Sequence, residues 1–186
     1  DYGTPGKIRS KKIIEDLGIT QVIFENEVRL AIKKTDFEAN TIKLVARFGG
    51  GKLEEPTDKP GLVSLANNVF IQGGLGKHSY EELERLLAGK NVGGTFSVSS
   101  DCFRLSGSTT PDDFELEMNL LMAYLTDPGY REDILPQVRT KYKKGYDAMQ
   151  RNPMGIMRDQ VAKFLAGGDP RFGSATPAQF DAVSMS

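Results

Sequence analysis

Residues 59–74 read KPGLVSLANNVFIQGG, the clearest amphipathic pattern in the first half of the chain. Apolar residues recur there every three or four positions, which places them on one stripe of a helix. Pro60 suits the first helical turn, where its missing N–H costs nothing, and the glycines at 73 and 74 suit the end. The pattern predicts a buried helix. Its stripe consists of Leu62, Leu65, Ala66, Val69 and Phe70.

The composition is that of a globular domain, because 39% of the 186 residues are hydrophobic and 26% are charged. The net charge is −1, so no overall field attracts nucleic acid or an anionic membrane, and we expect neither as a partner. Cys102 is the one cysteine, which excludes an internal disulfide. Cys102 and His78, the one histidine, are too few for a zinc site built from His and Cys ligands.

The first part of the chain predicts an arm followed by a sheet. Residues 1–18 are polar and mixed, and we interpret them as a linker or N-terminal arm to a single α+β domain over residues 19–186. Residues 22–34 alternate as a hairpin with Glu27 in its turn, and residues 41–48 alternate as a further strand. Their polar outer positions indicate an antiparallel sheet that is solvated on one side.

The later elements follow ordinary start and stop signals. Ser79 and Glu82 have the spacing of a capping box, residues 93–108 predict a second hairpin, and three helices begin near Thr110, Arg131 and Asn152. We expect the methionines of the last helix to fill core space. The predicted buried stripes are Phe114, Met118, Leu121, Met122 and Leu125; Ile134, Leu135, Val138, Tyr142 and Tyr146; and Met154, Met157, Val161, Phe164 and Leu165.

The helix over residues 59–74 resembles the motif helix of the pitrilysin/insulinase family of zinc metallopeptidases. In that family an inverted His-x-x-Glu-His motif precedes a Phe and a glycine-containing turn. With Phe70 as the anchor, Val63 and Asn67 stand at the positions of the two zinc histidines, and Ala66 stands at the position of the general-base glutamate. The segment therefore resembles a peptidase helix whose reactive side chains have been replaced.

A third zinc ligand of the active family members, a glutamate, would fall at Lys144-Gly145. No carboxylate is there, and Asp147 lies at the far edge of the window. The resemblance thus implies no catalytic residue and no metal ligand in this chain. Polarising a carbonyl and generating hydroxide, the work of the zinc ion, is not available to it. The degenerate motif positions are Val63, Ala66, Asn67 and Gly145.

The family resemblance also implies a fold and a role. We expect an α+β fold with an antiparallel or mixed sheet and helices packed on one face, the LuxS/MPP-like metallohydrolase fold, truncated at its C-terminus. Family members contain duplicated domains, some catalytic and some bare. The chain resembles a bare repeat of a long bacterial member, with zinc in the catalytic domain of the parent metalloendopeptidase. Other domains of the same parent chain are the implied partners, and a periplasmic or secreted parent agrees with the resemblance.

The resemblance implies that the domain helps to form the substrate chamber and holds an extended peptide. An edge strand can bind such a peptide by adding main-chain hydrogen bonds. The expected edge is the end of the strand over residues 41–50, with Phe48, Gly49 and Gly50 as substrate-binding residues. The glycine run at 49–51 could instead cradle phosphate, but no Lys-Ser/Thr follows it, and a flexible turn is favoured.

Two other functions stay open from the sequence. The first is a structural or scaffold subunit of the same fold, like the bare core subunits of respiratory complexes. The second is an enzyme of unrelated chemistry that uses His78, Asp101, Cys102 or Asp147. A basic helix face is interpreted as solvated rather than as a binding patch. It consists of Arg139, Lys141, Lys143 and Lys144.

Overall fold

The structure, a computed structural model, describes residues 4–184. The chain divides into two compact units, residues 1–40 and residues 41–186. The boundary predicted at residue 18 therefore falls inside the first unit. Strands and helices occur in separate runs along the chain, and the strands pair antiparallel, so the predicted α+β class is confirmed. Among the described helices, none has the length and apolar character needed to cross a membrane.

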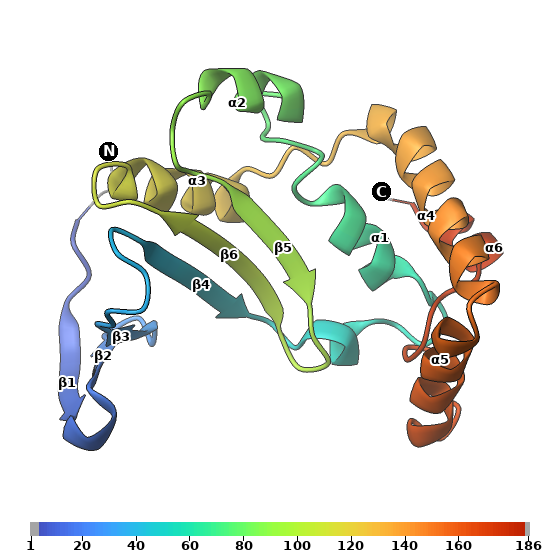
Figure 1. Ribbon diagram of the computed structural model, residues 1–186, viewed down its shortest axis with the longest axis horizontal. Helices are drawn as coiled ribbons and strands as arrows, with labels where there is room; N and C mark the ends of the chain where they lie inside the picture. The colour runs from blue at the N-terminus through green and yellow to red at the C-terminus, as the bar shows by residue number, and fades with distance from the viewer. Residues whose placement is uncertain (1–3, 185–186) are drawn as a thin grey trace. The chain divides into compact units, whose positions relative to one another are not determined.

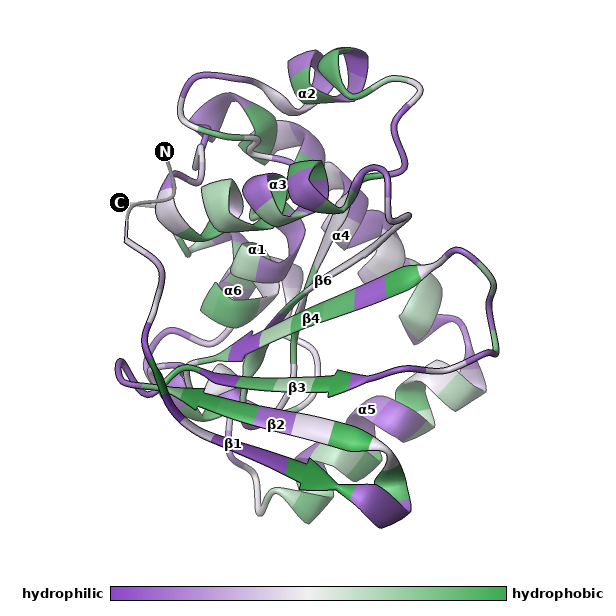
Figure 2. Ribbon diagram, turned by 90° about the vertical axis from the view of Figure 1, so that its left-hand side faces the viewer, coloured by the Kyte–Doolittle hydropathy of each residue, from purple (hydrophilic) through white to green (hydrophobic). Residues whose placement is uncertain are grey.

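The first unit is a three-stranded antiparallel sheet in the order β1-β2-β3, and hydrophilic and hydrophobic residues mix along each strand (Figure 2). The predicted hairpin is confirmed as β2 and β3. The predicted arm is corrected, because residues 8–14 form β1; residues 1–3 lie outside the described part. Backbone pairing with β2 creates this strand, which its polar composition did not reveal. The strands are β1 (Ile8–Ile14), β2 (Ile19–Phe24) and β3 (Arg29–Lys33).

The hairpin turn shows how Glu27 is accommodated. The Glu27 N–H donates to the Phe24 carbonyl at 3.0 Å, and the Phe24 N–H donates to the Val28 carbonyl at 2.9 Å. Glu27 has φ = 67°, the left-handed region that glycine prefers. The connection is thus a three-residue loop with a left-handed last residue, a common hairpin geometry.

The second unit contains a sheet in the order β4-β6-β5, all antiparallel (Figure 1). The strand predicted over residues 41–48 is confirmed as β4, and the second hairpin is confirmed as β5 and β6. β4 pairs with β6, whereas we expected it to share a sheet with the preceding hairpin. β4 and β5 are the two outer strands. The bounds are β4 (Ile42–Phe48), β5 (Gly94–Val98) and β6 (Phe103–Thr109).

One face of this sheet is covered by helices, as the sequence predicted. α3 (Phe114–Thr126) packs against β6, and α1 (Leu62–Val69) approaches β5. The opposite face carries exposed polar residues such as Arg104 and Thr95. The covered face contributes to a core of apolar side chains from both layers. Its buried members are Phe70, Leu83, Phe96, Leu105, Leu120, Leu121 and Tyr124.

A second apolar cluster joins α1 to two later helices, α4 (Leu135–Gln150) and α6 (Pro177–Asp181). Leu65 of α1 is 1% exposed there, and it packs with Val138 and Phe180. The predicted motif helix is therefore confirmed as a buried element. Its start is corrected, because Gly61 precedes the first turn with φ = 105° and Pro60 lies outside the helix.

The remaining helices begin largely where the sequence placed them. Ser79 and Glu82 form the predicted capping box of α2 (Tyr80–Leu86). The Asn152 side chain accepts from the Met154 N–H at 3.0 Å and caps α5 (Pro153–Leu165). Three short 3₁₀ turns complete the chain: η1 (Glu15–Leu17), η2 (Gly51–Glu54) and η3 (Glu132–Ile134).

Two predicted helix features are wrong in detail. α3 begins at Phe114 rather than near Thr110, because the carboxylate of Asp113 accepts from the Asn91 N–H instead of capping its own helix. Leu121 of the stripe predicted on α3 is buried as expected, but the other four members are half exposed, and Leu120 and Tyr124 face the sheet in their place. The half-exposed members are Phe114, Met118, Met122 and Leu125.

Candidate functional site

The N-terminus of α1 is held by a buried carboxylate that sequence reasoning missed. Glu55 Oε1 accepts from the backbone N–H groups of Gly61 and Val63, both at 2.9 Å. The first turn of a helix leaves such N–H groups without partners, and its dipole favours a negative charge. Glu55 therefore fixes the start of the motif helix from a segment six residues upstream of Gly61.

The motif positions of α1 do not form a zinc site. Val63 is buried, Ala66 is half-buried, and Asn67 is exposed. The side chains of Val63 and Ala66 are hydrocarbon and contain no atom that can bind a metal. Gly145, at the position of the third ligand, is exposed on α4. Within residues 4–184, no group of three or more His, Cys, Asp or Glu residues could hold a metal ion.

An aromatic side chain occupies the contact between α1 and α4. Tyr142 of α4 stacks on Phe180 with ring centroids 3.8 Å apart, and its hydroxyl donates to the Ala175 carbonyl at 2.9 Å. Burial raises the pKa of Tyr142, whereas a hydrogen bond with Ser64 of α1 lowers it. Packing and neutral hydrogen bonds thus hold the motif helix to its neighbour.

The glycine run after β4 is a packed turn. Gly49 and Gly51 have φ values of 57° and 61°, which other residues rarely adopt. A side chain at Gly51 would overlap the backbone of the β5–β6 turn at Ser99, and the Lys52 N–H donates to the Ser99 carbonyl at 3.0 Å. These glycines therefore allow close backbone approach, which corrects the expectation of a flexible turn.

The predicted substrate-binding residues lie at the end of an outer strand. Phe48, Gly49 and Gly50 follow one another at the C-terminal end of β4. The ring of Phe48 is 5.8 Å from that of Phe103 on β6, and Phe48 remains 37% exposed. β4 pairs with β6 along one edge, and no described strand pairs with the other edge. Its position is that of a strand to which an extended peptide can be added.

A hollow of about 510 Å³ lies at the other end of β4. Lys43 and Val45 of β4, Ser106 of β6 and Thr95 of β5 contribute to its lining, so it opens on the face of the sheet away from the helices. The structure therefore does not bring this hollow together with Phe48 and the following glycines.

The four residues considered for unrelated enzyme chemistry lie on three separate elements. His78 is exposed in the turn before α2, and Asp147 is exposed on α4. Asp101 and the buried Cys102 follow one another in the β5–β6 turn. A hydrogen bond with Cys102, and then the charge of Asp101 at 3.5 Å, raise the pKa of Arg47. The charged side chain that pairs with this turn is therefore Arg47 of β4.

Glu117 of α3 is a second buried carboxyl that sequence reasoning missed. It is 0% exposed, and its Oε2 accepts from the Gly93 N–H at 2.8 Å. Its Oε1 has no hydrogen-bond partner among the described residues. Burial raises the pKa of Glu117, while the Gly93 hydrogen bond lowers it less. The only available signal was Gly107 inside β6, because its missing side chain leaves the space that Glu117 occupies.

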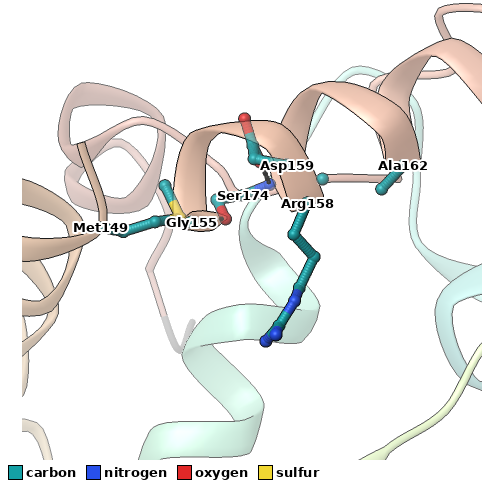
Figure 3. A pocket seen from close by; sticks show the side chains of 7 residues that line it. Met149, Gly155, Arg158, Asp159, Ala162 and Ser174 are labelled. Atoms are coloured by element: carbon teal, nitrogen blue, oxygen red, sulfur yellow. Dashed lines mark hydrogen bonds between the residues drawn. The ribbon is translucent and has the colours of Figure 1, made fainter. Parts of the chain in front are cut away.

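Asp159 anchors α5 from its inner side (Figure 3). It is 4% exposed, and it accepts from Lys163 Nζ at 2.7 Å and from the Ser174 N–H at 2.5 Å. Desolvation raises the pKa of Asp159, but these two hydrogen bonds outweigh it and lower the pKa overall. The side chain of Arg158 leaves the helix in another direction.

A hollow of about 260 Å³ lies beside this anchor. Both carboxylate oxygens of Asp159 already accept hydrogen bonds, and the Ser174 hydroxyl lies 3.4 Å from the sulfur of Met149. The polar groups of Asp159 and Ser174 at the hollow are thus engaged within the fold. Its lining consists of Met149, Gly155, Arg158, Asp159, Ala162, Gly173 and Ser174.

Known proteins are similar to this chain in sequence and in fold. The chain is 23% identical over 188 residues to the chloroplastic stromal processing peptidase of Pisum sativum, covering 96% of the chain and 15% of that protein. It is 22% identical over 161 residues to the probable zinc protease PqqL of Escherichia coli K12, covering 87% and 17%. A solved peptidase M16 inactive domain from Pseudomonas fluorescens superposes with a TM-score of 0.76 at 14% identity, covering 91% and 41%. No family model matches.

An antiparallel sheet with the motif helix and α3 on one face is the architecture of a peptidase-type α+β domain. In sequence and in fold the chain is similar to pitrilysin-like domains of the M16 peptidases. The resemblance drawn from residues 59–74 is thereby confirmed. The chain spans about 15% of the length of the pea peptidase and 17% of PqqL.

Proposed function

We propose that the chain is a non-catalytic domain of a larger zinc metallopeptidase, where it helps to enclose the substrate chamber and holds an extended peptide. The observation that carries the proposal is the state of α1. The helix keeps its place against the sheet, whereas Val63, Ala66 and Asn67 replace the zinc and base side chains. Such a domain retains the shape of a peptidase unit without its reaction.

The relatives support a division of labour within a longer chain. The pea and E. coli proteins are a peptidase and a probable zinc protease by name, and this chain matches only a small part of each. Zinc and the general base belong, in this proposal, to a separate catalytic domain of the parent. The domain described here contributes a wall and a binding edge.

The binding edge is β4. A peptide laid along it would add backbone hydrogen bonds to a strand that pairs on one side, the usual mode of strand addition. At its end, the half-exposed ring of Phe48 is available to such a peptide, whereas Gly49 packs against Phe103 and Gly50 against Glu54. Main-chain pairing tolerates many sequences, which suits a holding role.

β5 offers the second edge of the same sheet, and α1 packs on that side. Hydrogen exchange separates the two edges. Unstructured 15-residue peptides of varied sequence would be added to the protein, and amide exchange would be compared along both strands. We expect slower exchange in residues 42–48 with no change in residues 94–98. Slower exchange confined to β5 would move the site to that edge.

The role in a peptidase is tested separately in the full-length parent. We expect an intact zinc motif outside residues 1–186, zinc bound to the parent, and no peptide cleavage by this chain alone. A Phe48→Ala variant of the parent should raise KM for long peptides more than it lowers kcat, because the substitution removes a peptide-binding contact and leaves the reacting groups unchanged. A parent without any zinc motif, and without peptide-dependent protection of either edge, would contradict the proposal and favour a scaffold protein.

A further inference from the structure

α5 turns its apolar side away from the protein. Five large apolar residues at helical spacing are 46–83% exposed, although the sequence predicts them as a buried stripe. Methionines make up two of the five, so the expectation that they fill core space is wrong. We call this set the α5 stripe. It consists of Met154, Met157, Val161, Phe164 and Leu165.

A buried charge fixes this orientation. Asp159 lies about 200° around the helix from Val161, since each residue turns an α-helix by roughly 100°. Its carboxylate is bound by Lys163 and by the Ser174 N–H. Rolling α5 to bury the stripe would break the bond from the Ser174 N–H, since Lys163 turns with the helix, and would expose a carboxylate side chain that is now 4% exposed. The outward direction of the stripe is therefore built into the fold.

The surroundings of the stripe are basic. Residues 135–165, which form α4 and α5, contain seven Lys or Arg and two Asp, whereas the other residues contain 17 Lys or Arg and 23 Asp or Glu. α4 packs directly against α5, and Arg158 is exposed one position from Met157. Arg139 is paired with Asp181 and Lys163 with Asp159 on the inner side of α5; the exposed cations of the two helices are Lys141, Lys143, Lys144, Arg151 and Arg158.

Polypeptide that could cover the stripe exists in the relatives. The chain spans 41% of the solved inactive domain and 15–17% of the two peptidases, so most of each relative lies outside the matched part. An exposed apolar stripe along a whole helix is typical of an interaction surface. Because cations border the stripe, we expect carboxylates on the segment that covers it.

We propose that the α5 stripe is the docking surface for a second segment of the same parent polypeptide, one that presents apolar side chains flanked by Asp or Glu. The proposal rests on the proposed function, in which this chain is one domain of a longer peptidase. A second copy of α5 is disfavoured, because it would bring two basic helix pairs together. A lipid surface is the alternative occupant that the vesicle arm of the test below distinguishes.

Thiol protection in the full-length parent tests this inference. Met157→Cys and Phe164→Cys place a thiol on the stripe, and Lys143→Cys places one on the exposed face of α4. Maleimide alkylation of each variant would be timed in the folded parent and in urea, with the buried Cys102 replaced by Ala. We expect the two stripe thiols to react at least 10-fold more slowly when folded than in urea. The Lys143→Cys thiol should react at nearly equal rates in both.

The partner is then identified by a zero-length cross-link. In an Arg158→Lys variant, carbodiimide would couple the new amine to a carboxylate in contact, and mass spectrometry would locate it. We expect an Asp or Glu of the same polypeptide outside residues 1–186. Three results would overturn the inference: fast alkylation of both stripe thiols, a cross-link between two copies, or protection that appears only with phosphatidylserine vesicles. If the parent still cleaves peptides while the stripe thiols react fast, this inference fails and the proposed function stands.

Discussion

α1 and α5 have the same kind of sequence pattern, but the apolar stripe of α1 is buried and that of α5 is exposed. Both have apolar residues every three or four positions, and both begin beside a proline. In α1 the stripe lies inside two apolar clusters, with Leu65 at 1% exposure. In α5 the stripe faces outward, and Phe164 is 83% exposed. Helical periodicity therefore identifies a stripe, but it does not say what covers it.

The difference arises from where each helix is anchored by a carboxylate. Glu55 binds the N-terminus of α1 end-on and leaves the sides of the helix free to pack. Asp159 projects from the side of α5 and ties that side to the backbone at Ser174. A buried, bonded charge cannot be exchanged for an apolar contact without losing its partners. A single internal Asp thus decides which face of α5 the protein covers.

The largest expected effect contrasts the two stripes directly. Leu65→Ala should reduce the free energy of unfolding by about 2–5 kcal/mol, because it leaves a cavity in a packed core. In the 186-residue chain by itself, where Phe164 is exposed, Phe164→Ala should change it by less than about 0.5 kcal/mol, as for most exposed positions. Urea unfolding followed by circular dichroism measures both. Equal losses for the two variants would mean that the α5 stripe is covered in solution.

The next largest effect on stability is expected from Asp159, the carboxylate that anchors the side of α5. Asp159→Ala should cost about 1–3 kcal/mol, because it leaves the Ser174 N–H without its partner. The pKa of Asp159 is lower when folded, so its contribution is present above the unfolded value of about 3.9. It is lost as pH falls from there through the folded pKa. Unfolding curves between pH 7 and pH 2 measure this, with the exposed Asp147→Ala as the matched control. A constant difference across that range would refute the assignment.

The third largest effect on stability is expected from Glu55, the carboxylate that binds the N-terminus of α1. Glu55→Ala should cost about 1–2 kcal/mol, because two N–H groups of the first turn lose their acceptor. Hydrogen exchange should speed up first at Val63 and its neighbours. Asn152→Ala, which removes the one cap bond of α5, is the matched variant and should cost about 1 kcal/mol or less. If exchange in α1 stays unchanged in Glu55→Ala, the carboxylate does not hold the helix.

The smallest effect on the free energy of unfolding is expected at Glu117, where the pH dependence has the opposite sign to that of Asp159. The pKa of Glu117 is higher when folded, so its contribution is full below the unfolded value of about 4.3 and is lost as pH rises through the folded pKa. Glu117→Gln keeps an acceptor for the Gly93 N–H and removes the buried charge. It should therefore be more stable than the wild type by about 1 kcal/mol at pH 7. Denaturation at pH 4 and pH 7 checks this, and a variant that loses stability at pH 7 would contradict it.

Local signals were read correctly wherever both partners of an interaction lie within a few residues. Ser79 and Glu82 cap α2, Asn152 caps α5, and the alternation over residues 94–109 gives β5 and β6. Failures occurred where the partner is distant. Glu55, Asp113 and Glu117 bind backbone N–H groups in other elements, and no short-range pattern marks such pairs.

The same division applies to the candidate site. The expected replacement of zinc and base side chains on the motif helix comes from residue identity, since the hydrocarbon side chains of Val63 and Ala66 offer a metal no electron pair and the Asn67 amide is not among the usual zinc ligands. Only the three-dimensional structure could show that β4 is an outer strand, because this depends on its pairing with β6, some 60 residues away in the chain. The sequence predicted a strand there and placed it in the wrong sheet.

By itself, the sequence of this chain determined its helices and most of its strands, and the resemblance of its buried helix to a pitrilysin-type motif helix. These properties depend on residue type and spacing over a few turns. The tertiary structure alone decided which apolar stripe is buried, which strands form an edge and which carboxylates are desolvated. Each of those outcomes is set by contacts between segments far apart in the chain, where burial of one group fixes the exposure of another.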